Sequence, residues 1–256
     1  MYRVICAKWG NNLYSDSDID LLYSKVSKNC SVDFEFECFT KFPEELEQYK
    51  QKYYRASLEP DYRFDAIQNG YHRDDFGGIP HYRKILLFSL DAKFDKKDTI
   101  LYLDLDTNIE GDLAYFFENL SDEKPYLVWN YWWESKPEEW LRQYHITRCP
   151  LYNSSVMRWK PGQQRPIYDF LYKNRDKCFF TYPSMDTFMF HQFGPYSHDG
   201  RDKHYAYFPE GIVTSERVIS NSHFWINYNE KDTTQKKGII HMLEGLTKEE
   251  KKDVSS

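Results

Sequence analysis

Residues 99–106 of the chain read TILYLDLD, an apolar run that ends in two acids separated by one leucine. Apolar residues at nearly every position are typical of a strand covered on both faces, as the central strands of parallel sheets are. Open α/β sheets bind their ligands at the carboxyl ends of such strands. The stretch therefore predicts an α/β protein with Asp104 and Asp106 at the ligand-binding edge of its central sheet.

The residues before this strand alternate between strand-like and helix-like patterns. Residues 2–9 and 34–39 read as strands, the second with strict alternation (FEFECF), and residues 16–29 carry apolar side chains at helical spacing. A strand, a helix and a strand within so short a stretch indicate a right-handed crossover and a parallel sheet.

Further elements are expected along the rest of the chain. Helices are predicted over residues 44–55, 81–90, 112–119, 166–176 and from 184 or 186 to 193, and strands over 126–131, 151–159 and 238–242. Residues 57–80 contain Gly and Pro breakers, which predict a loop. No repeat or linker divides the sequence, so we expect one domain over 1–246 and a polar tail over 247–256.

The composition is that of a soluble globular protein. Of 256 residues, 41% are hydrophobic and 29% charged, and no apolar run is long enough to predict a membrane span. The formal net charge of −6 argues against a nucleic-acid partner, because phosphate backbones require basic surfaces. The first nine residues lack the pattern of a signal peptide. The five scattered cysteines form no C-x-x-C pair, so we expect a cytoplasmic protein with reduced thiols and no structural zinc.

The acid pair itself suggests a cation. Asp104 and Asp106 are two residues apart, so they point the same way unless the backbone turns between them. Two adjacent carboxylates repel each other and are costly to desolvate without a cation. A hard divalent ion such as Mn²⁺ or Mg²⁺ would relieve both problems and would also grip a diphosphate. The plainer alternative is a pair of surface acids where a strand gives way to a turn.

Residues 100–113, ILYLDLDTNIEGDL, resemble the D-x-D segment of the fold-A (GT-A) glycosyltransferases. They are especially similar to family 8, the glycogenin-like group, and to short viral and bacterial glycosyltransferases. Three further segments resemble the family in the same order, HYRKILLF at 81–88, YNSSVMRW at 152–159 and IIHM at 239–242. The resemblance implies a single-domain nucleotide-diphospho-sugar transferase fold. Its central sheet is expected to be mostly parallel and flanked by helices, with a mixed second sheet toward the C-terminus.

The resemblance also implies which residues form the site. The implied metal ligands are Asp104, Asp106 and His241, around Mn²⁺ or Mg²⁺. The implied donor-binding residues are Ala7, Lys8, Trp9, Arg83, Lys84, Asp104 and Leu105. The implied catalytic residues, on the acceptor side of the metal, are Asn153 and Asp186.

Several of these residues have a plainer alternative role. His241 is otherwise a hydrogen-bonded histidine at a strand end, and Trp9 a core aromatic residue. Asp186 is equally well explained as the N-cap of its helix. Residues 83–84 are otherwise a solvated basic pair, and residues 131–133 (YWW) are either an acceptor platform or buried packing.

Some positions depart from the family pattern. Ser155 replaces the glycine of the "FNSGVM" strand, which leaves a close backbone approach there open. Residues 184–186, SMD, stand where the family usually has Gln-Asp, and the Lys-Pro-Trp that often follows the histidine is absent. The donor-phosphate contacts near Gly245 therefore stay open.

Together these patterns predict a metal-dependent glycosyltransferase. The expected reaction transfers a sugar from a nucleotide diphosphate, with UDP-hexose as the expected donor, to a glycan or other hydroxyl acceptor. A metal-dependent phosphohydrolase or nuclease is the first alternative, although two-metal sites need more acids than one pair. A non-catalytic carbohydrate-binding protein would explain the 18% aromatic content but not the acid pair. A sugar-nucleotide pyrophosphorylase would need a Gly-rich, Arg-containing loop after the first strand, which residues 10–12 (GNN) do not supply.

Overall fold

The computed structural model describes residues 1–8, 14–40, 54–57, 79–89, 94–129, 151–182, 184–194, 204–209, 211–215 and 240–242. The strands of its large sheet are β1 (Tyr2–Lys8), β2 (Phe34–Thr40), β3 (Tyr54–Ser57), β4 (Thr99–Leu103), β6 (Tyr126–Trp129), β7 (Tyr152–Trp159) and β8 (Ala206–Tyr207). A smaller sheet contains β5 (Thr107–Ile109), β9 (Val213–Ser215) and β10 (Ile240–Met242). The helices are α1 (Asp16–Lys28), the 3₁₀ helix η3 (Ile79–Phe88), α3 (Ala114–Glu118), α7 (Arg165–Thr181) and α8 (Met185–Phe193).

The large sheet is mixed, with a parallel half that contains the N-terminus. Its strand order is β3-β2-β1-β4-β7-β6-β8. Strands β3, β2, β1 and β4 run parallel to one another, and β7 runs antiparallel to both β4 and β6. The start of β7 therefore lies at the same edge of the sheet as the carboxyl ends of β1, β4 and β6.

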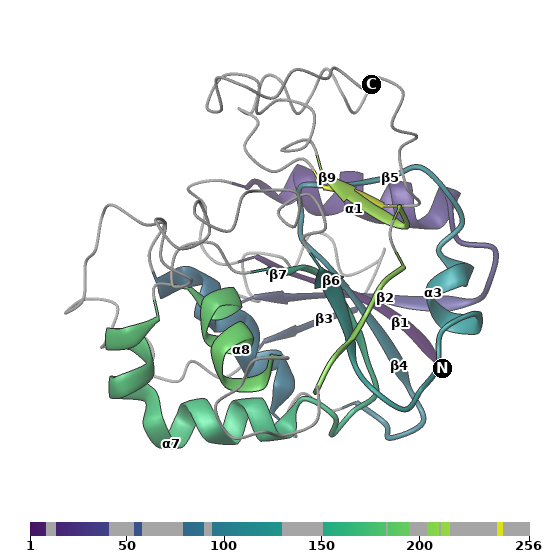
Figure 1. The fold of residues 1–256 in the computed structure, drawn as a ribbon. Helices are drawn as coiled ribbons and strands as arrows, with labels where there is room; N and C mark the ends of the chain where they lie inside the picture. The colour runs from purple at the N-terminus through teal and green to yellow at the C-terminus, as the bar shows by residue number, and fades with distance from the viewer. Residues whose placement is uncertain are drawn as a thin grey trace, which may run out of the picture.

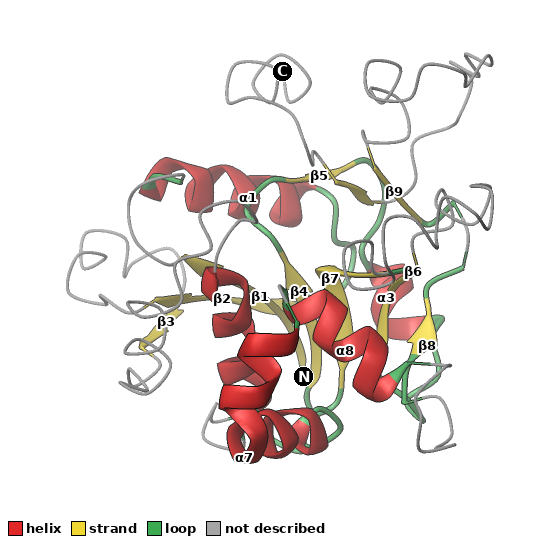
Figure 2. Ribbon diagram, turned by 60° about the vertical axis from the view of Figure 1, so that its left-hand side comes forward, coloured by secondary structure: helices red, strands yellow, loops and turns green. Residues whose placement is uncertain are grey.

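Strand β1 shows why the sheet is covered on both faces. Its buried side chains alternate, so that Val4 and Cys6 join one hydrophobic core while Ile5 and Ala7 join the other. The helices η3, α7 and α8 supply the second core, and α1 and α3 supply the first. Figures 1 and 2 show α7 and α8 on one side of the large sheet and α1 with the small sheet on the other. The fold is thus the layered α/β architecture that the sequence predicts.

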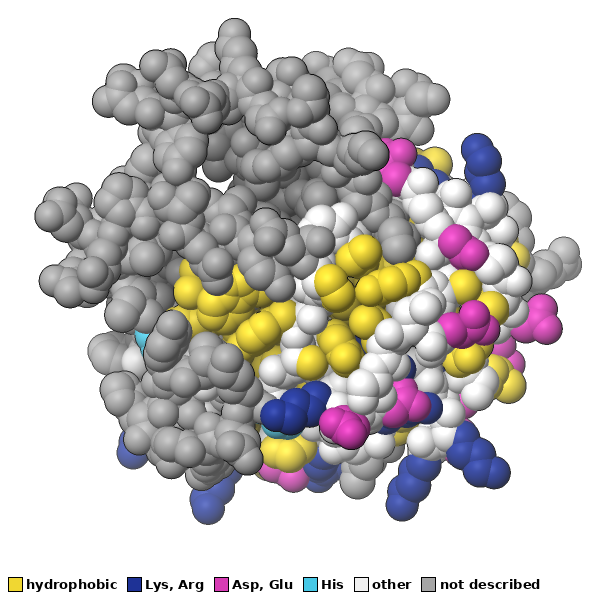
Figure 3. Space-filling model, turned by 45° about the vertical axis from the view of Figure 1, so that its right-hand side comes forward, with side chains coloured by type: hydrophobic (Ala, Val, Ile, Leu, Met, Phe, Trp, Pro, Cys, Tyr) yellow, Lys and Arg dark blue, Asp and Glu magenta, His cyan; other side chains and the backbone are white. Residues whose placement is uncertain are grey.

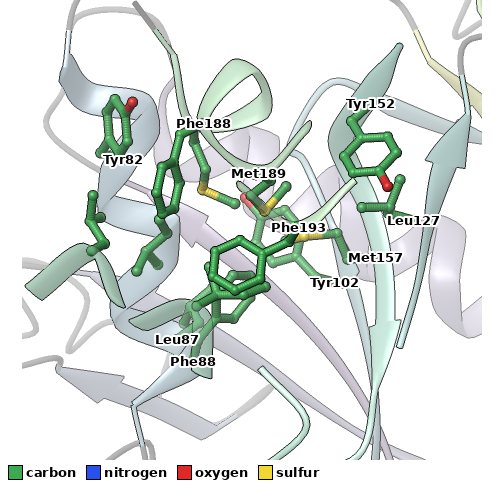
Figure 4. Packing of buried hydrophobic residues seen from close by; sticks show 14 of the residues in the cluster. Tyr82, Leu87, Phe88, Tyr102, Leu127, Tyr152, Met157, Phe188, Met189 and Phe193 are labelled. Atoms are coloured by element: carbon green, nitrogen blue, oxygen red, sulfur yellow. The ribbon is translucent and has the colours of Figure 1, made fainter. Parts of the chain in front are cut away.

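Aromatic and sulfur side chains fill the core on the α8 side. Phe188 and Met189 of α8 are fully buried and reach between η3, which carries Tyr82, and β7, which carries Met157 (Figure 4). The Tyr82 ring meets Phe179 of α7 edge to face, with ring centroids 4.7 Å apart. This packing fixes η3 and α8 against β7, and these are the elements that carry Lys84 and Asp186.

Helix α3 and the small sheet are joined to α1 by a short polar link. The Asp112 carboxylate accepts hydrogen bonds from the backbone N–H groups of Ala114 (2.9 Å) and Ser31 (3.0 Å). The Leu113 N–H donates to the carbonyl of Asn29 at 2.8 Å. The chain after the acid pair is therefore held to the end of α1, which limits the movement of the turn between β4 and β5.

Most of the expected elements are observed, with two corrections. The predicted helix over residues 44–55 is wrong at its end, because Arg55 lies in the parallel strand β3; residues 44–53 fall outside the described residues. The predicted strand over 99–106 ends at Leu103. The short strands β5, β8 and β9 are not among the predicted elements, because their three or fewer residues show no usable periodicity.

Charge on the described surface is mixed. On the face drawn in Figure 3, the described Lys and Arg side chains lie among Asp and Glu side chains and form no continuous basic stripe. Among the residues that the model describes, no helix is long and apolar enough to cross a membrane.

One histidine is held neutral by its surroundings. His204 is half-buried against Phe193 and Tyr205, and its Nε2 atom has no hydrogen-bond partner in the described structure. Burial, and to a smaller extent the nearby charge of Lys124, lowers the pKa of His204 from 6.5 to about 4, although a hydrogen bond with the Gln163 backbone works in the opposite direction.

Acidification is expected to destabilise the fold through His204. The unfolded histidine binds a proton near pH 6.5, whereas the folded one does so only near pH 4, so stability falls as the pH drops between these values. Between pH 6.5 and 5 the loss should be about 1.5 kcal/mol. Urea unfolding at both pH values would measure it, and His204→Phe should remove most of this difference. An unchanged pH dependence in the variant would contradict the assignment.

Candidate active site

The acid pair lies on a turn and not on a strand. Strand β4 ends at Leu103, and the Thr107 N–H and hydroxyl both donate to the carbonyl of Asp104, the backbone bond measuring 3.2 Å. Leu105, between the acids, is 9% exposed and packs into the core on the α1 side. The backbone therefore turns between Asp104 and Asp106, which is the exception that the sequence leaves open.

Asp104 is held by two side chains. The ammonium group of Lys84, on η3, lies 2.7 Å from Oδ2 of Asp104, and the Tyr102 hydroxyl donates to Oδ1 at 2.5 Å. The Asp104 N–H donates to the carbonyl of Ser155 at 2.9 Å. Burial of Lys84 works to lower its pKa, but the charges of Asp104, Asp186 and Asp106 outweigh burial and raise it. Lys84 therefore stays protonated inside the acid cluster.

Asp186 lies in the first turn of α8 and faces β7. Ser184 is the N-cap of this helix, since its side-chain oxygen accepts the Thr187 N–H at 3.2 Å, so the N-cap alternative for Asp186 is wrong. The Asp186 carboxylate instead accepts the N–H of Ser154 at 3.1 Å. Burial raises the pKa of Asp186 and so does Asp104, while Lys84 and the Ser154 hydrogen bond lower it, with a net increase. A carboxylate with a raised pKa is suited to proton exchange.

A β-bulge in β7 makes these contacts possible. In the pairing of β6 with β7, Leu127 lies opposite Met157, whereas the next residue, Val128, lies opposite Asn153. Residues 154–156 of β7 are therefore outside the ladder that β7 forms with β6. Their backbone groups then bond elsewhere. The Ser154 N–H reaches Asp186, its carbonyl accepts from Lys84 at 3.5 Å, and the Ser155 N–H donates to Asn153 Oδ1 at 2.7 Å. The serine at the family's glycine position is thus accommodated within the bulge.

Asp106 and the start of α1 form the other side of the site. The Tyr14 hydroxyl donates to Asp106 Oδ2 at 2.9 Å. Lys8, at the end of β1 after the buried Ala7, pairs with Asp16 in the first turn of α1, with Nζ 2.7 Å from Oδ1. The predicted donor residue Lys8 is therefore engaged with an acid from α1 at the same sheet edge.

The described groups suit a divalent cation, although they do not complete a ligand set. No group of three His, Cys, Asp or Glu side chains that could hold a metal ion is found among the described side chains. Asp104, Asp106, Asp186 and Lys84 together carry two negative charges when all are ionised, and carboxylate oxygens are the ligands that Mg²⁺ and Mn²⁺ prefer. The backbone of His241 in β10 pairs with Asn108 in β5, two residues after Asp106. That register brings the third predicted ligand into the strand beside the acid turn.

Part of the predicted site lies outside the described residues. Trp9, Tyr131, Trp132, Trp133 and Gly245 are not described, and neither are the side chains of Arg83 and His241. Among the others, the structure brings Lys84, Asp104, Asp106, Asn153 and Asp186 to one edge of the sheet, with Ala7, Lys8 and Leu105 adjoining it.

Sequence reasoning missed the groups that hold these acids. Tyr102 could have been found, because it precedes Asp104 by two residues at the end of an alternating strand. Ser154 lies inside the quoted YNSSVMRW segment, but a backbone N–H carries no signal in the sequence. Tyr14 lies 92 residues from Asp106, and no local pattern links the two.

Comparison with known proteins identifies the fold. No protein-family model matches the chain, and no curated protein sequence matches it. A galactosyltransferase LgtC structure with donor and acceptor sugar analogues matches 99% of the chain and 95% of its own length, with a TM-score of 0.62 and 10% identity.

Two other solved glycosyltransferases are similar over nearly their whole length. One is involved in glycosylation of the major capsid of PBCV-1 (TM-score 0.52, 13% identity, 99% of this chain and 98% of that one). The other is mouse xyloside xylosyltransferase 1 (TM-score 0.54, 13% identity, 95% and 98%). The chain therefore has the GT-A fold of these enzymes, and at such identities the likeness establishes the fold alone.

Removing Lys84 is expected to destabilise the protein by leaving buried acid charge uncompensated. In the metal-free protein Lys84→Met should lower the free energy of unfolding by about 3 kcal/mol, because breaking one side of a buried pair strands the other. Lys84→Met combined with Asp104→Asn should lose less than the sum of the two single changes. Urea unfolding of the four proteins would measure this, and additive losses would show that the two groups do not interact.

Proposed function

We propose that this chain is a metal-dependent glycosyltransferase that transfers a hexose from UDP-hexose to a hydroxyl group of a glycan or similar acceptor, with UDP as the leaving group. The observation that carries the proposal is the convergence of Asp104, Asp106 and Asp186 around Lys84 at the carboxyl edge of a GT-A sheet. Similarity to LgtC, whose structure contains donor and acceptor sugar analogues, supports sugar transfer as the reaction class.

In this proposal the acid turn holds the donor. Asp104, Asp106 and His241 would hold Mn²⁺ or Mg²⁺, which supplies positive charge where the leaving diphosphate becomes negative. Lys84 and Arg83, on η3, would bind the diphosphate oxygens. Ala7, Lys8 and Leu105, which adjoin the same edge, would contact the nucleoside together with Trp9.

Asp186 and Asn153 would act on the sugar and the acceptor. A hydroxyl acceptor must lose a proton as it attacks, and a carboxylate of raised pKa at hydrogen-bonding distance can take it. The same carboxylate, placed on the other side of the anomeric carbon, would instead stabilise the positive charge that develops there. Asn153, fixed through the Ser155 N–H, would orient the acceptor.

Lys84 favours this proposal over a two-metal phosphohydrolase. Two-metal sites hold their ions about 4 Å apart between bridging carboxylates. Here an ammonium group occupies the space beside Asp104 and is stabilised by the charges of Asp186 and Asp106 as well. A second cation would meet the positive charge of Lys84, so the described acids suit one ion.

Calorimetric titration of UDP and of GDP, each with and without Mn²⁺, tests the donor site. We expect UDP to bind only with Mn²⁺ and Asp106→Ala to weaken this binding at least tenfold, because the variant removes a charged ligand. Asp33→Ala, an exposed acid near the start of β2, is the matched control and should bind as the wild type does.

The same titration tests the predicted base, the donor site and the metal dependence separately. Binding of GDP but not UDP would show that the donor carries guanine and not uracil. Binding of neither nucleotide under any condition would contradict the proposed donor site. Metal-independent binding of UDP would contradict the metal dependence while keeping a donor site.

Asp186→Asn is expected to separate donor binding from chemistry. The variant should retain Mn²⁺-dependent UDP binding but release UDP from UDP-hexoses at least about 100-fold more slowly, because it lacks the carboxylate that acts on the reacting groups. A UDP-release assay over a panel of UDP-hexoses measures this, with Asp169→Asn on the exposed face of α7 as control. A wild-type rate in Asp186→Asn would exclude Asp186 from catalysis.

A further inference from the structure

Tyr14 connects a separate part of the chain to the acid turn. Its hydroxyl lies 2.9 Å from Oδ2 of Asp106, and its side chain is half-buried. The phenol hydroxyl is the donor in this bond, because a carboxylate only accepts. Asp104 receives its two side-chain contacts from β4 and η3, whereas Tyr14 reaches Asp106 from the start of α1.

The backbone that follows Tyr14 is anchored by several contacts. Ser15 is the N-cap of α1, and its N–H and hydroxyl both donate to the Asp18 carboxylate at 2.6 and 2.8 Å. Asp16 is paired with Lys8 at the end of β1. The inner face of α1, formed by Ile19, Leu22 and Val26, is fully buried against the sheet. These contacts hold the start of α1, from which the Tyr14 ring reaches Asp106.

The turn that carries Asp106 is equally constrained. Leu105 and Thr107, on either side of Asp106, are buried, and Thr107 enters β5. The hydrogen bond from Tyr14 thus joins the start of α1 to the turn after β4 through the Asp106 side chain. A hydrogen bond from a fixed donor selects one orientation of a carboxylate, and such second-layer bonds strengthen metal binding.

We propose that Tyr14 is a positioning residue that holds the carboxylate of Asp106 in the orientation needed to bind a divalent cation. The inference rests on the proposed metal-dependent function and assigns to the start of α1 a role in the metal site. With Tyr14 in place, less side-chain freedom is lost when the cation binds. Without it, Asp106 must be ordered by the cation itself.

The test measures Mn²⁺ binding directly and needs no catalytic turnover. Titration of the protein with MnCl₂, with free Mn²⁺ followed by electron paramagnetic resonance, gives the dissociation constant. Tyr14→Phe should weaken Mn²⁺ binding about tenfold or more, the usual effect of losing such a partner. Its melting temperature in EDTA should stay close to that of the wild type, because the change removes one hydroxyl at the surface of the site.

Tyr205→Phe is the matched control. It also removes one hydrogen-bonded tyrosine hydroxyl, which donates to Gln164 Oε1 at 2.9 Å within the core of the α8 side. Its Mn²⁺ dissociation constant should stay within about twofold of the wild type, whatever its effect on melting.

The outcomes distinguish this inference from the proposed function. Wild-type or tighter Mn²⁺ binding by Tyr14→Phe would overturn the positioning role and leave the metal-dependent function standing. Weaker binding in both variants in proportion to their loss of melting temperature would also overturn it, since the effect would then follow from stability. Absence of Mn²⁺ binding by the wild type would overturn the metal site itself, and the positioning role with it.

Discussion

The arrangement of the acidic residues at the carboxyl edge of the large sheet depends on the positive charge of Lys84. Asp104, Asp106 and Asp186 all act on Lys84, which is almost completely buried. Three carboxylates in a partly desolvated corner would repel one another, and an ion pair 2.7 Å long relieves that repulsion. η3 must therefore pack against α7 and α8 so that Lys84 reaches the acids. The aromatic packing around Tyr82 and Phe188 holds η3 in that position. The ion pair between Lys84 and Asp104 therefore depends on the hydrophobic core on the α8 side of the sheet.

Much of the fold is predictable from the sequence, because its central strands carry strong local patterns. The alternation in β2 and the apolar run of β4 both predict strands. β2 is nevertheless buried on both faces, since Phe36 joins one core and Phe39 the other. The parallel half of the sheet follows from these two patterns. The edge strands β3 and β8 are different, because short strands with mixed side chains are defined by their neighbours and not by their own residues. Arg55 illustrates this: its charged surroundings favour a helix, yet it pairs with Cys38 of β2.

The site is predictable only in part. Asp104, Asp106, Lys84 and Asp186 could be proposed because their residue types and order carry information. Their arrangement could not, because it depends on groups without a local signature. The turn after Leu103 is closed by the Thr107 N–H and hydroxyl, which both donate to the Asp104 carbonyl. The orientation of Asp186 depends on Ser184 capping the helix in its place and on one backbone N–H of β7.

The bulge in β7 has a consequence for how this protein can change. All eight residues of β7 are buried, so the strand is a central part of the hydrophobic core. The same strand supplies, through its backbone, the contacts that hold Asp104, Asp186 and Lys84. A substitution that repacks the interior of β7 therefore shifts the acids as well, even where it lies well away from them. The stability of the fold and the geometry of the acidic residues therefore both depend on β7, and selection that changes one of these properties also changes the other.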